Sequence, residues 1–217
     1  MGTKDKQLIY RLIKLLYDHN EEHIGSCLSA VEVLDRIYKE KKPEDIVILS
    51  NGHAAYALYV ILEKYHKIDA DYLAKKHLGH PNRDIEDNIY CSTGSLGQGI
   101  TVGVGAALAS PDKKVYITIS DGECAEGSVW ESLAFINKMK LDNVEVTAII
   151  NGFAGYETVD PDYLKTRLKA FLPNIIFHEV SETEISFIKG LEAHYIKLDE
   201  KQYEDAISEL DGKYEHS

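Results

Sequence analysis

The fold is decided by residues 115–152, which read VYITISDGECAEGSVWESLAFINKMKLDNVEVTAIING. Residues 115–119 and 144–150 are apolar and rich in β-branched side chains, which is typical of buried strands. Between them, apolar side chains recur at helical spacing, at Val129, Leu133, Ile136 and Met139. The segment therefore predicts a βαβ unit, in which both strands run parallel.

Similar patterns continue on both sides of this unit. Apolar periodicity predicts helices over 5–18, 54–65, 70–77, 100–109 and 200–210, and β-branched runs predict strands at 45–50 and 174–180. Two further helices are predicted from their starts. One begins at Ser29, where Ser29-Ala30-Val31-Glu32 has the form of a capping box after a loop at 22–26, and the other begins at 161 and is capped by Asp160. We therefore expect an α/β fold, a doubly wound and mostly parallel sheet with helices on both faces, as one domain over residues 1–217.

The charge and the cysteines narrow the class of protein. The 24 Lys and Arg against 36 Asp and Glu give a net charge of −12, which repels nucleic acids and anionic lipid surfaces. The 3 cysteines show no CxxC spacing, so neither a disulfide framework nor a zinc site is indicated. With no signal peptide pattern and no apolar run of about 18 residues, the sequence predicts a cytoplasmic protein without nucleic acid or membrane partners.

Two polar residues follow neighbouring strands of the predicted unit. Asp121 comes just after the first strand and Asn151 just after the second, and ligands of parallel sheets bind at this edge. A carboxylate and an amide oxygen are suitable ligands for a hard divalent cation that bridges a diphosphate. The alternative is that Asp121-Gly122 and Asn151-Gly152 are ordinary turn dipeptides.

Several motifs, in order along the chain, resemble those of the transketolase family. They are His23-Ile24-Gly25-Ser26, Leu49-Ser50-Asn51-Gly52-His53, Gly79-His80-Pro81, residues 92–99 (STGSLGQG), residues 120–131 (SDGECAEGSVWE), Asn151-Gly152-Phe153 and the region from Ser186 to Tyr195. The resemblance covers nearly the whole chain and implies a thiamin diphosphate-binding fold of the diphosphate-binding type.

The resemblance assigns roles residue by residue. It implies that Mg²⁺ (or Ca²⁺ or Mn²⁺) is held by Asp121, Asn151 and the carbonyl of Phe153, and that the cofactor contacts Gly94, Ser95, Leu96, Gly122, Glu123, Asn151 and Gly155. It implies that the reacting carbon is surrounded by His23, His53, His80 and His194. Glu126 and Glu131 match acidic positions between the two cofactor sites of a dimer.

The sequence also departs from the family pattern. Ser120 replaces a glycine, and Gly155 stands where the family has an aliphatic side chain against the cofactor ring. After Phe171 about one βα unit is missing, and the acidic segment 179–184 replaces a cluster of lysine and glycine.

The resemblance implies a split enzyme. In the family, the pyrimidine-binding pocket and its activating glutamate belong to a second domain, which has no counterpart in these 217 residues. We therefore expect a subunit that transfers a two-carbon ketol unit between sugars or sugar phosphates, in a heterotetramer with a separate pyrimidine-binding subunit. In isolation, the chain is expected to be inactive, to bind the cofactor weakly and to form homodimers around Glu126 and Trp130. The alternatives are another thiamin diphosphate-dependent ligation, of a pyruvate-derived unit or on a nucleotide-linked sugar, and a non-catalytic regulatory relative.

Overall fold

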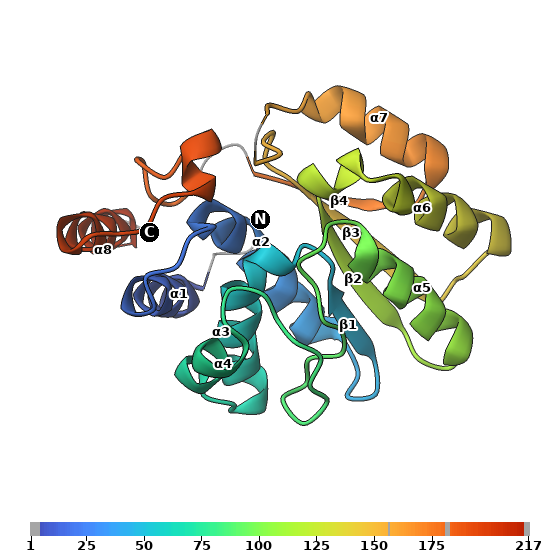
Figure 1. The fold of residues 1–217 in the computed structure, drawn as a ribbon, viewed down its shortest axis with the longest axis horizontal. Coiled ribbons are helices and arrows are strands. Elements are labelled where there is room, and N and C mark those ends of the chain that lie inside the picture. Colours follow the sequence, from blue (N-terminus) through green and yellow to red (C-terminus); the bar gives the residue numbers. More distant parts are fainter. Residues whose placement is uncertain (1–4, 156, 181–182, 215–217) are drawn as a thin grey trace.

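The computed structural model describes residues 5–155, 157–180 and 183–214 (Figure 1). Its helices are α1 (Lys6–Asp18), α2 (Ile24–Glu40), α3 (Ala55–His66), α4 (Ala70–His77), α5 (Gln98–Ala109), α6 (Gly127–Met139), α7 (Pro161–Phe171) and α8 (Glu200–Tyr214), with single 3₁₀ turns η1 (Gly52–Ala54), η2 (Gly122–Ala125) and η3 (Leu191–His194). Its strands are β1 (Ile46–Leu49), β2 (Val115–Ser120), β3 (Val144–Ile150) and β4 (Ile176–Glu179).

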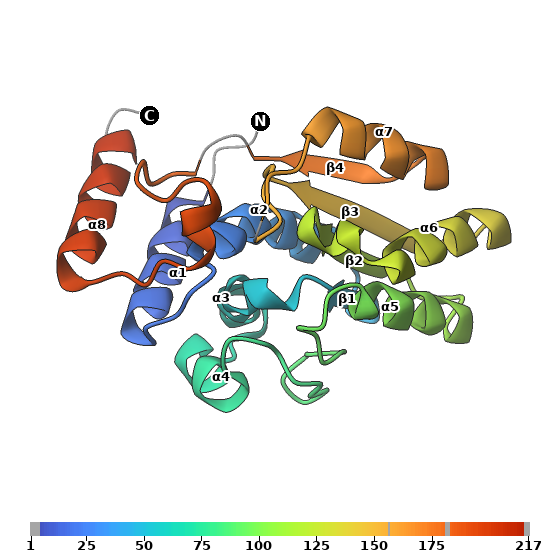
Figure 2. The ribbon, with the colours of Figure 1, turned by 45° about the horizontal axis from the view of Figure 1, so that its top comes forward.

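The described strands form one parallel sheet of 4 strands in the order β1-β2-β3-β4. Helices α5, α6 and α7 cover one face, while α2 lies against the other, with α1 and α3 packed against α2 (Figures 1 and 2). The expected parallel sheet with helices on both faces is therefore confirmed. Each strand lies beside the next one in sequence, so the strand order does not reverse. The helices on the second face therefore come from the chain before β1 and from α3.

Successive side chains of a strand point to opposite faces of the sheet, so the apolar core has two parts, one under each layer of helices. Ile117 and Ile119 of β2 point into the cluster under α5, α6 and α7, whereas Tyr116 points into the cluster under α1, α2 and α3. All 6 residues of β2 are buried, which explains their continuous apolar run.

Acidic side chains begin several helices, among them the predicted cap Asp160. Asp5, Asp69 and Asp160 accept hydrogen bonds from backbone N–H groups in the first turns of α1, α4 and α7. Such a cap contributes about 1 kcal/mol to helix stability. Pro161 follows Asp160 at the first helical position, where its missing N–H has no cost.

The start predicted for the second helix is wrong. Helix α2 begins at Ile24, so the predicted loop at 22–26 overlaps its first turn. Ser29 lies inside the helix, where its hydroxyl donates to the Gly25 carbonyl at 2.8 Å and does not cap anything. The physical reason is burial, because every residue from Ile24 to Val31 is packed in the interior and the helix gains by including them.

The other boundaries differ by a few residues. The last strand is shorter than predicted and the last helix longer, ending at Tyr214. Met139 is 50 % exposed, although it continues the apolar spacing of α6. None of the helices in the part of the chain that the structure describes has the length and apolar content needed to span a bilayer.

Candidate functional site

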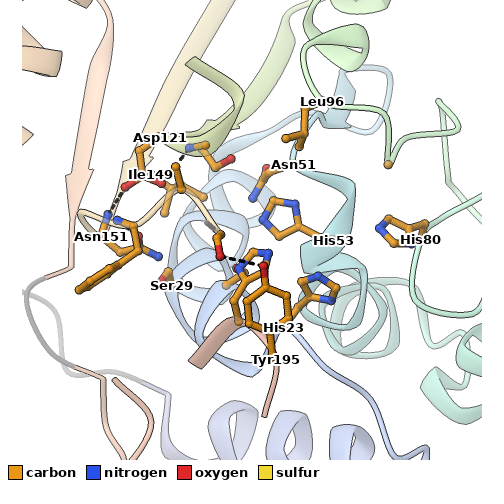
Figure 3. A pocket seen from close by; sticks show the side chains of 18 residues that line it. His23, Ser29, Asn51, His53, His80, Leu96, Asp121, Ile149, Asn151 and Tyr195 are labelled. Carbon is orange, nitrogen blue, oxygen red and sulfur yellow. Dashed lines mark hydrogen bonds between the residues drawn. The ribbon is translucent and has the colours of Figure 1, made fainter. Parts of the chain in front are cut away.

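A pocket of about 230 Å³ opens at the carboxyl ends of β1, β2 and β3 (Figure 3). Its wall is formed by residues that follow these strands, by the start of α2, by the turn before α5 and by η3. The residues are His23, Ser26, Ser29, Asn51, His53, His80, Gly94, Leu96, Ser120, Asp121, Gly122, Ile149, Asn151, Phe153, Ala154, Gly155, His194 and Tyr195.

Asp121 is a buried carboxylate at the end of β2. One oxygen accepts from Gly122 N at 3.1 Å, and the other accepts from Asn151 N at 3.0 Å and Gly152 N at 2.8 Å. Burial raises the pKa of the Asp121 carboxyl, and the hydrogen bonds from these backbone N–H groups oppose that rise. A cation bound here would compensate the buried negative charge.

Asn151 and Phe153 belong to a hairpin that folds back toward Asp121. The Asn151 Oδ1 atom accepts from Phe153 N at 3.0 Å, and Phe153 pairs with Thr158 in an isolated antiparallel bridge. Carboxylate, amide and carbonyl oxygens thus come from one end of the pocket, as a Mg²⁺ ion bound to a diphosphate requires. The residues present fit such an ion.

The turn before α5 forms another side of the pocket, with Gly94 and Leu96 in its wall. The Glu123 carboxylate holds this turn from beneath, accepting from Gly97 N at 2.9 Å and from the Ser50 hydroxyl at 2.6 Å. Ser50 in turn accepts from Ile100 N at 3.0 Å. Burial raises the pKa of Glu123, and its hydrogen-bond donors lower it. Of the predicted cofactor contacts, Glu123 therefore lies under the turn, outside the wall of the pocket.

Ser95 also lies away from the pocket wall. It is exposed at the tip of the turn, while Gly94 on one side and Leu96 on the other line the pocket. Gly94 has φ +140°, and a Cβ atom there would lie 2.9 Å from the ring of His80, so the position requires glycine.

The predicted histidines converge on the open side of the pocket. The ring centroid of His23 lies 4.5 Å from that of His194, 5.5 Å from that of His53 and 6.0 Å from that of His80. His23 begins α2 in a left-handed conformation, and its N–H donates to the His194 carbonyl at 3.0 Å. Segments that lie far apart in the sequence are thereby joined at this cluster.

His23, His53 and His194 are held in the uncharged form. Burial, together with the smaller effect of the neighbouring histidines, lowers the pKa of His53 to about 3 and that of His23 to about 4. Burial also lowers the pKa of His194. At neutral pH these rings can accept and donate hydrogen bonds without carrying charge.

Gly155 and Tyr195 rearrange one side of the pocket. Gly155 has φ +68°, and a Cβ atom there would approach the His194 ring to 3.3 Å. The Tyr195 hydroxyl donates to the Gly155 carbonyl at 2.8 Å, and the Tyr195 ring packs edge-on against His194. At position 155, where an aliphatic side chain was expected, the backbone of Gly155 is instead covered by the His194 imidazole and the Tyr195 phenol.

Sequence reasoning missed several residues of the pocket wall. Ser26 and Asn51 lie inside motifs already singled out, so their positions could be read from the sequence. Ser29 was missed because it was assigned to a helix cap. Tyr195 was missed because attention went to the histidine that precedes it in the motif. Glu126 and Glu131 are exposed outside the pocket.

A second cluster of possible metal ligands, at His77, Asp84 and Asp87, lies outside this pocket. The Lys76 ammonium group already binds both carboxylates, at 2.7 Å from Asp84 and 2.8 Å from Asp87. This cluster therefore joins α4 to the loop that follows it.

Comparison with known proteins gives a consistent result. Residues 16–153 match the family model described as "Transketolase, thiamine diphosphate binding domain". A protein of Phocaeicola vulgatus that is named as one subunit of apulose-4-phosphate transketolase is 36 % identical over 155 residues, which are 62 % of this chain and 54 % of that protein. The 1-deoxy-D-xylulose-5-phosphate synthase of Fusobacterium nucleatum is 29 % identical over 194 residues, which are 87 % of this chain and 31 % of that protein.

Solved structures agree in fold. A transketolase variant from Pichia stipitis superposes with a TM-score of 0.75 at 22 % identity, over 99 % of this chain and 41 % of that one. Transketolase from Leishmania mexicana gives a TM-score of 0.71 at 19 % identity, over 97 % and 42 % of the two chains. The chain thus spans about half the length of the Phocaeicola vulgatus relative, and less of the other proteins.

Proposed function

Because the chain belongs to the family of transketolase domains that bind thiamin diphosphate, we propose that it is the diphosphate-binding subunit of a transketolase-like enzyme. In this proposal it transfers a two-carbon ketol unit between sugars or sugar phosphates, with a divalent metal ion and a separate pyrimidine-binding subunit. The observation that carries the proposal is the pocket itself, where the Asp121–Asn151 end and the histidine cluster face the same space.

The cofactor would be held by both sides of that space. Asp121, Asn151 and the Phe153 carbonyl would bind Mg²⁺, and Gly122 would lie against the diphosphate. Gly94 and Leu96 would contact the ring end of the cofactor, with Gly155 on the opposite wall. When bound, thiamin diphosphate supplies an electron sink for breaking and forming carbon–carbon bonds beside a carbonyl group.

The histidines would handle the hydroxyl and carbonyl groups of the sugar. His23, His53, His80 and His194 face one another across the opening, where a sugar chain would enter. Because the pKa values of His23 and His53 are low, these rings would orient hydroxyl groups and pass protons without repelling a metal-bound cofactor.

An exposed apolar surface supports the proposal of a partner chain. Helices α5 and α6 lie side by side, and we define the α5–α6 surface by their side chains Val102, Leu108, Phe135 and Met139, which are 39 to 50 % exposed. Gly105 lies among them with open space above it. Apolar side chains exposed on adjacent helices are typical of protein–protein interfaces. The Phocaeicola vulgatus relative is itself named as one subunit of its enzyme, which supports a two-chain arrangement that we propose to be a homodimer of heterodimers.

A related thiamin diphosphate reaction is the second candidate. The synthase from Fusobacterium nucleatum matches more of this chain, 87 %, than the apulose-4-phosphate transketolase relative, 62 %. This observation favours keeping pyruvate among the donors to be tested.

The test has two stages. First, titration calorimetry of the purified chain with thiamin diphosphate is compared in the presence of Mg²⁺ and of EDTA; metal-dependent binding is expected, and its absence would remove the site assignment. Second, a candidate partner chain is added and the transfer of carbon units from ketoses and from pyruvate to aldehydes is measured. Ketol transfer only in the mixture is expected, and robust transfer by the isolated chain would contradict the split arrangement.

A further inference from the structure

Asn51 is a nearly buried amide that faces the pocket. It follows β1, is only 2 % exposed, and forms part of the pocket wall between His53 and Leu96 (Figure 3). Its Oδ1 atom accepts a hydrogen bond from the Thr118 hydroxyl at 2.8 Å. Among the residues that the structure describes, no hydrogen-bond acceptor is found for its Nδ2 atom. The Nδ2 atom belongs to a residue of the pocket wall, so it remains available to donate a hydrogen bond to a ligand in the pocket.

Thr118 fixes the direction of this amide. It is fully buried in the middle of β2, and its backbone pairs with β1 through the Ser50 N–H, which donates to the Thr118 carbonyl at 3.0 Å. Because the Thr118 hydroxyl occupies Oδ1, the amide presents its NH₂ group to the pocket. Thr118 itself does not contribute to the pocket wall.

The position of Asn51 identifies the part of the ligand that it meets. Asn51 follows β1, and Asp121 and Gly122 follow the neighbouring strand β2, so these residues stand at the same edge of the sheet and line the same pocket. This is the end of the pocket that would hold a metal ion and a diphosphate. None of the residues described in the pocket wall is a lysine or an arginine. A neutral amide donor can bind an anionic oxygen here, where the buried Asp121 carboxylate already provides negative charge for the metal.

We propose that Asn51 donates a hydrogen bond from Nδ2 to an anionic oxygen of the cofactor's diphosphate, and that Thr118 is a positioning residue that sets the direction of this donor. The proposal rests on the proposed function, because it takes the ligand to be a metal-bound diphosphate ester.

The experiment measures the affinity of the full-length chain for thiamin diphosphate with Mg²⁺, by titration calorimetry, and the thermal stability of each ligand-free variant. Asn51→Ala is expected to raise the Kd about tenfold. Asn51→Asp is expected to raise it further, because a carboxylate would repel the diphosphate. Thr118→Val, which removes the hydroxyl at nearly constant volume, is expected to raise the Kd severalfold, and Thr118→Ser to restore it.

Thr147 provides a matched control. It pairs with Thr118 in the neighbouring strand and is equally buried, and its hydroxyl accepts from Arg36, away from the pocket. Thr147→Val is expected to change the Kd less than twofold, even if it lowers the melting temperature. A purely structural role for Thr118 would make both valine variants lower the melting temperature without a selective loss of affinity, and this result would overturn the positioning role.

Inorganic diphosphate with Mg²⁺ is the second probe, because it contains the anionic group alone. The Asn51→Ala variant is expected to lose affinity for both probes by a similar factor. If the unchanged chain binds neither probe, the proposed function fails. If it binds both and Asn51→Ala binds them equally well, the proposed function stands and the role of Asn51 is overturned.

Discussion

Burial lowers the pKa of His23, His53 and His194 in the pocket, and this has a cost in stability at low pH. In the unfolded chain a histidine takes up a proton below a pKa of about 6.5. In the folded chain, burial keeps the pKa of His23 near 4 and that of His53 near 3. The unfolded state therefore binds more protons than the folded state as the pH falls through this range.

The free energy of unfolding should consequently decrease as the pH falls from about 6.5 toward 4. Each fully buried histidine can contribute at most about 1.4 kcal/mol per pH unit in this window. Urea denaturation at a series of pH values checks this expectation. His53→Gln should make the dependence less steep, whereas an equally steep dependence in this variant would show that other groups cause it.

Asp121 is the carboxylate of the pocket wall, and it lies at the end of the pocket away from the histidine cluster. Asp121→Ala should weaken Mg²⁺-dependent binding of thiamin diphosphate tenfold or more, which corresponds to at least about 1.4 kcal/mol. Asp121→Asn keeps the size of the side chain, but it removes the charge together with one of the two oxygens that accept backbone N–H groups, so weaker binding is expected for this variant as well. Calorimetry at fixed Mg²⁺ concentration is the measurement, with the exposed Asp112→Asn as a control. Equal affinity in all the variants would contradict a metal site at Asp121.

The histidines should affect turnover more than cofactor affinity. His23→Ala, His53→Ala and His80→Ala remove groups from the side of the pocket where the sugar would enter, and leave Asp121 and Asn151 in place. In the complex with the partner, the expected result is a lower kcat with little change in the Kd for thiamin diphosphate. Full activity of all 3 variants would show that these rings have no role in the reaction.

Most of the site residues that the motifs singled out line the pocket, while their roles stay predictions. The resemblance could not predict which side of a turn each residue faces. Glu123 follows Gly122 directly, yet its carboxylate turns beneath the chain to bind Ser50 and Gly97. Asn51 depends on a hydroxyl from another strand, and such a contact follows from sheet register, which the motifs do not contain.

At the scale of the element, α5 is the helix most constrained by its glycines. A Cβ atom at Gly99 would lie 2.6 Å from Ser50 Cα, whereas a Cβ atom at Gly105 would meet nothing within 4 Å. Gly99→Ala should destabilise the chain by about 1–3 kcal/mol through this backbone contact. Gly105→Ala should stabilise it by about 0.5–1 kcal/mol through helix propensity.

Both substitutions lie in the same helix, so helix propensity alone predicts that each one increases the free energy of unfolding. Chemical denaturation of each variant is the measurement. If Gly99→Ala were also stabilising, the close packing between α5 and β1 would be wrong.

The start of α2 shows the limit of local capping signals. Ser29 and Glu32 have the spacing of a capping box, but the preceding residues are small or apolar and their burial extends the helix to Ile24. The cap at Asp160 could be predicted because it precedes a helix start marked by Pro161, whereas the caps of α1 and α4 at Asp5 and Asp69 were not predicted. Tertiary packing therefore decides a helix start where the flanking loop is itself buried.

At the scale of the whole molecule, the α5–α6 surface should mediate assembly. Leu108→Glu should leave the fold of the isolated chain intact and should weaken association with the partner chain by at least tenfold, because it places a charge in an apolar contact. Analytical ultracentrifugation of the mixed chains measures this. Tyr72→Glu, at a similarly exposed position on α4, is the control. If both variants assemble normally, the partner binds elsewhere.

The fold class could be predicted from the order of the apolar segments along the chain, because the strands and helices are long enough for their apolar side chains to show strand or helix spacing. The pattern of strand, helix and strand indicates parallel neighbours, and the structure adds the order of the strands. Two helices precede β1 and their position on the second face could not be derived from local patterns, because it depends on packing against β3 and α3.

The strand order has a consequence for synthesis on the ribosome. Each strand pairs with the one made just before it, so the sheet can grow as the chain emerges, without waiting for a later segment to insert between earlier ones. A nascent chain that has released β3 and the hairpin after it already contains Asp121 and Asn151 side by side. His194 comes from a much later segment, so the acidic end of the pocket can be complete while the histidine cluster still lacks one of its rings.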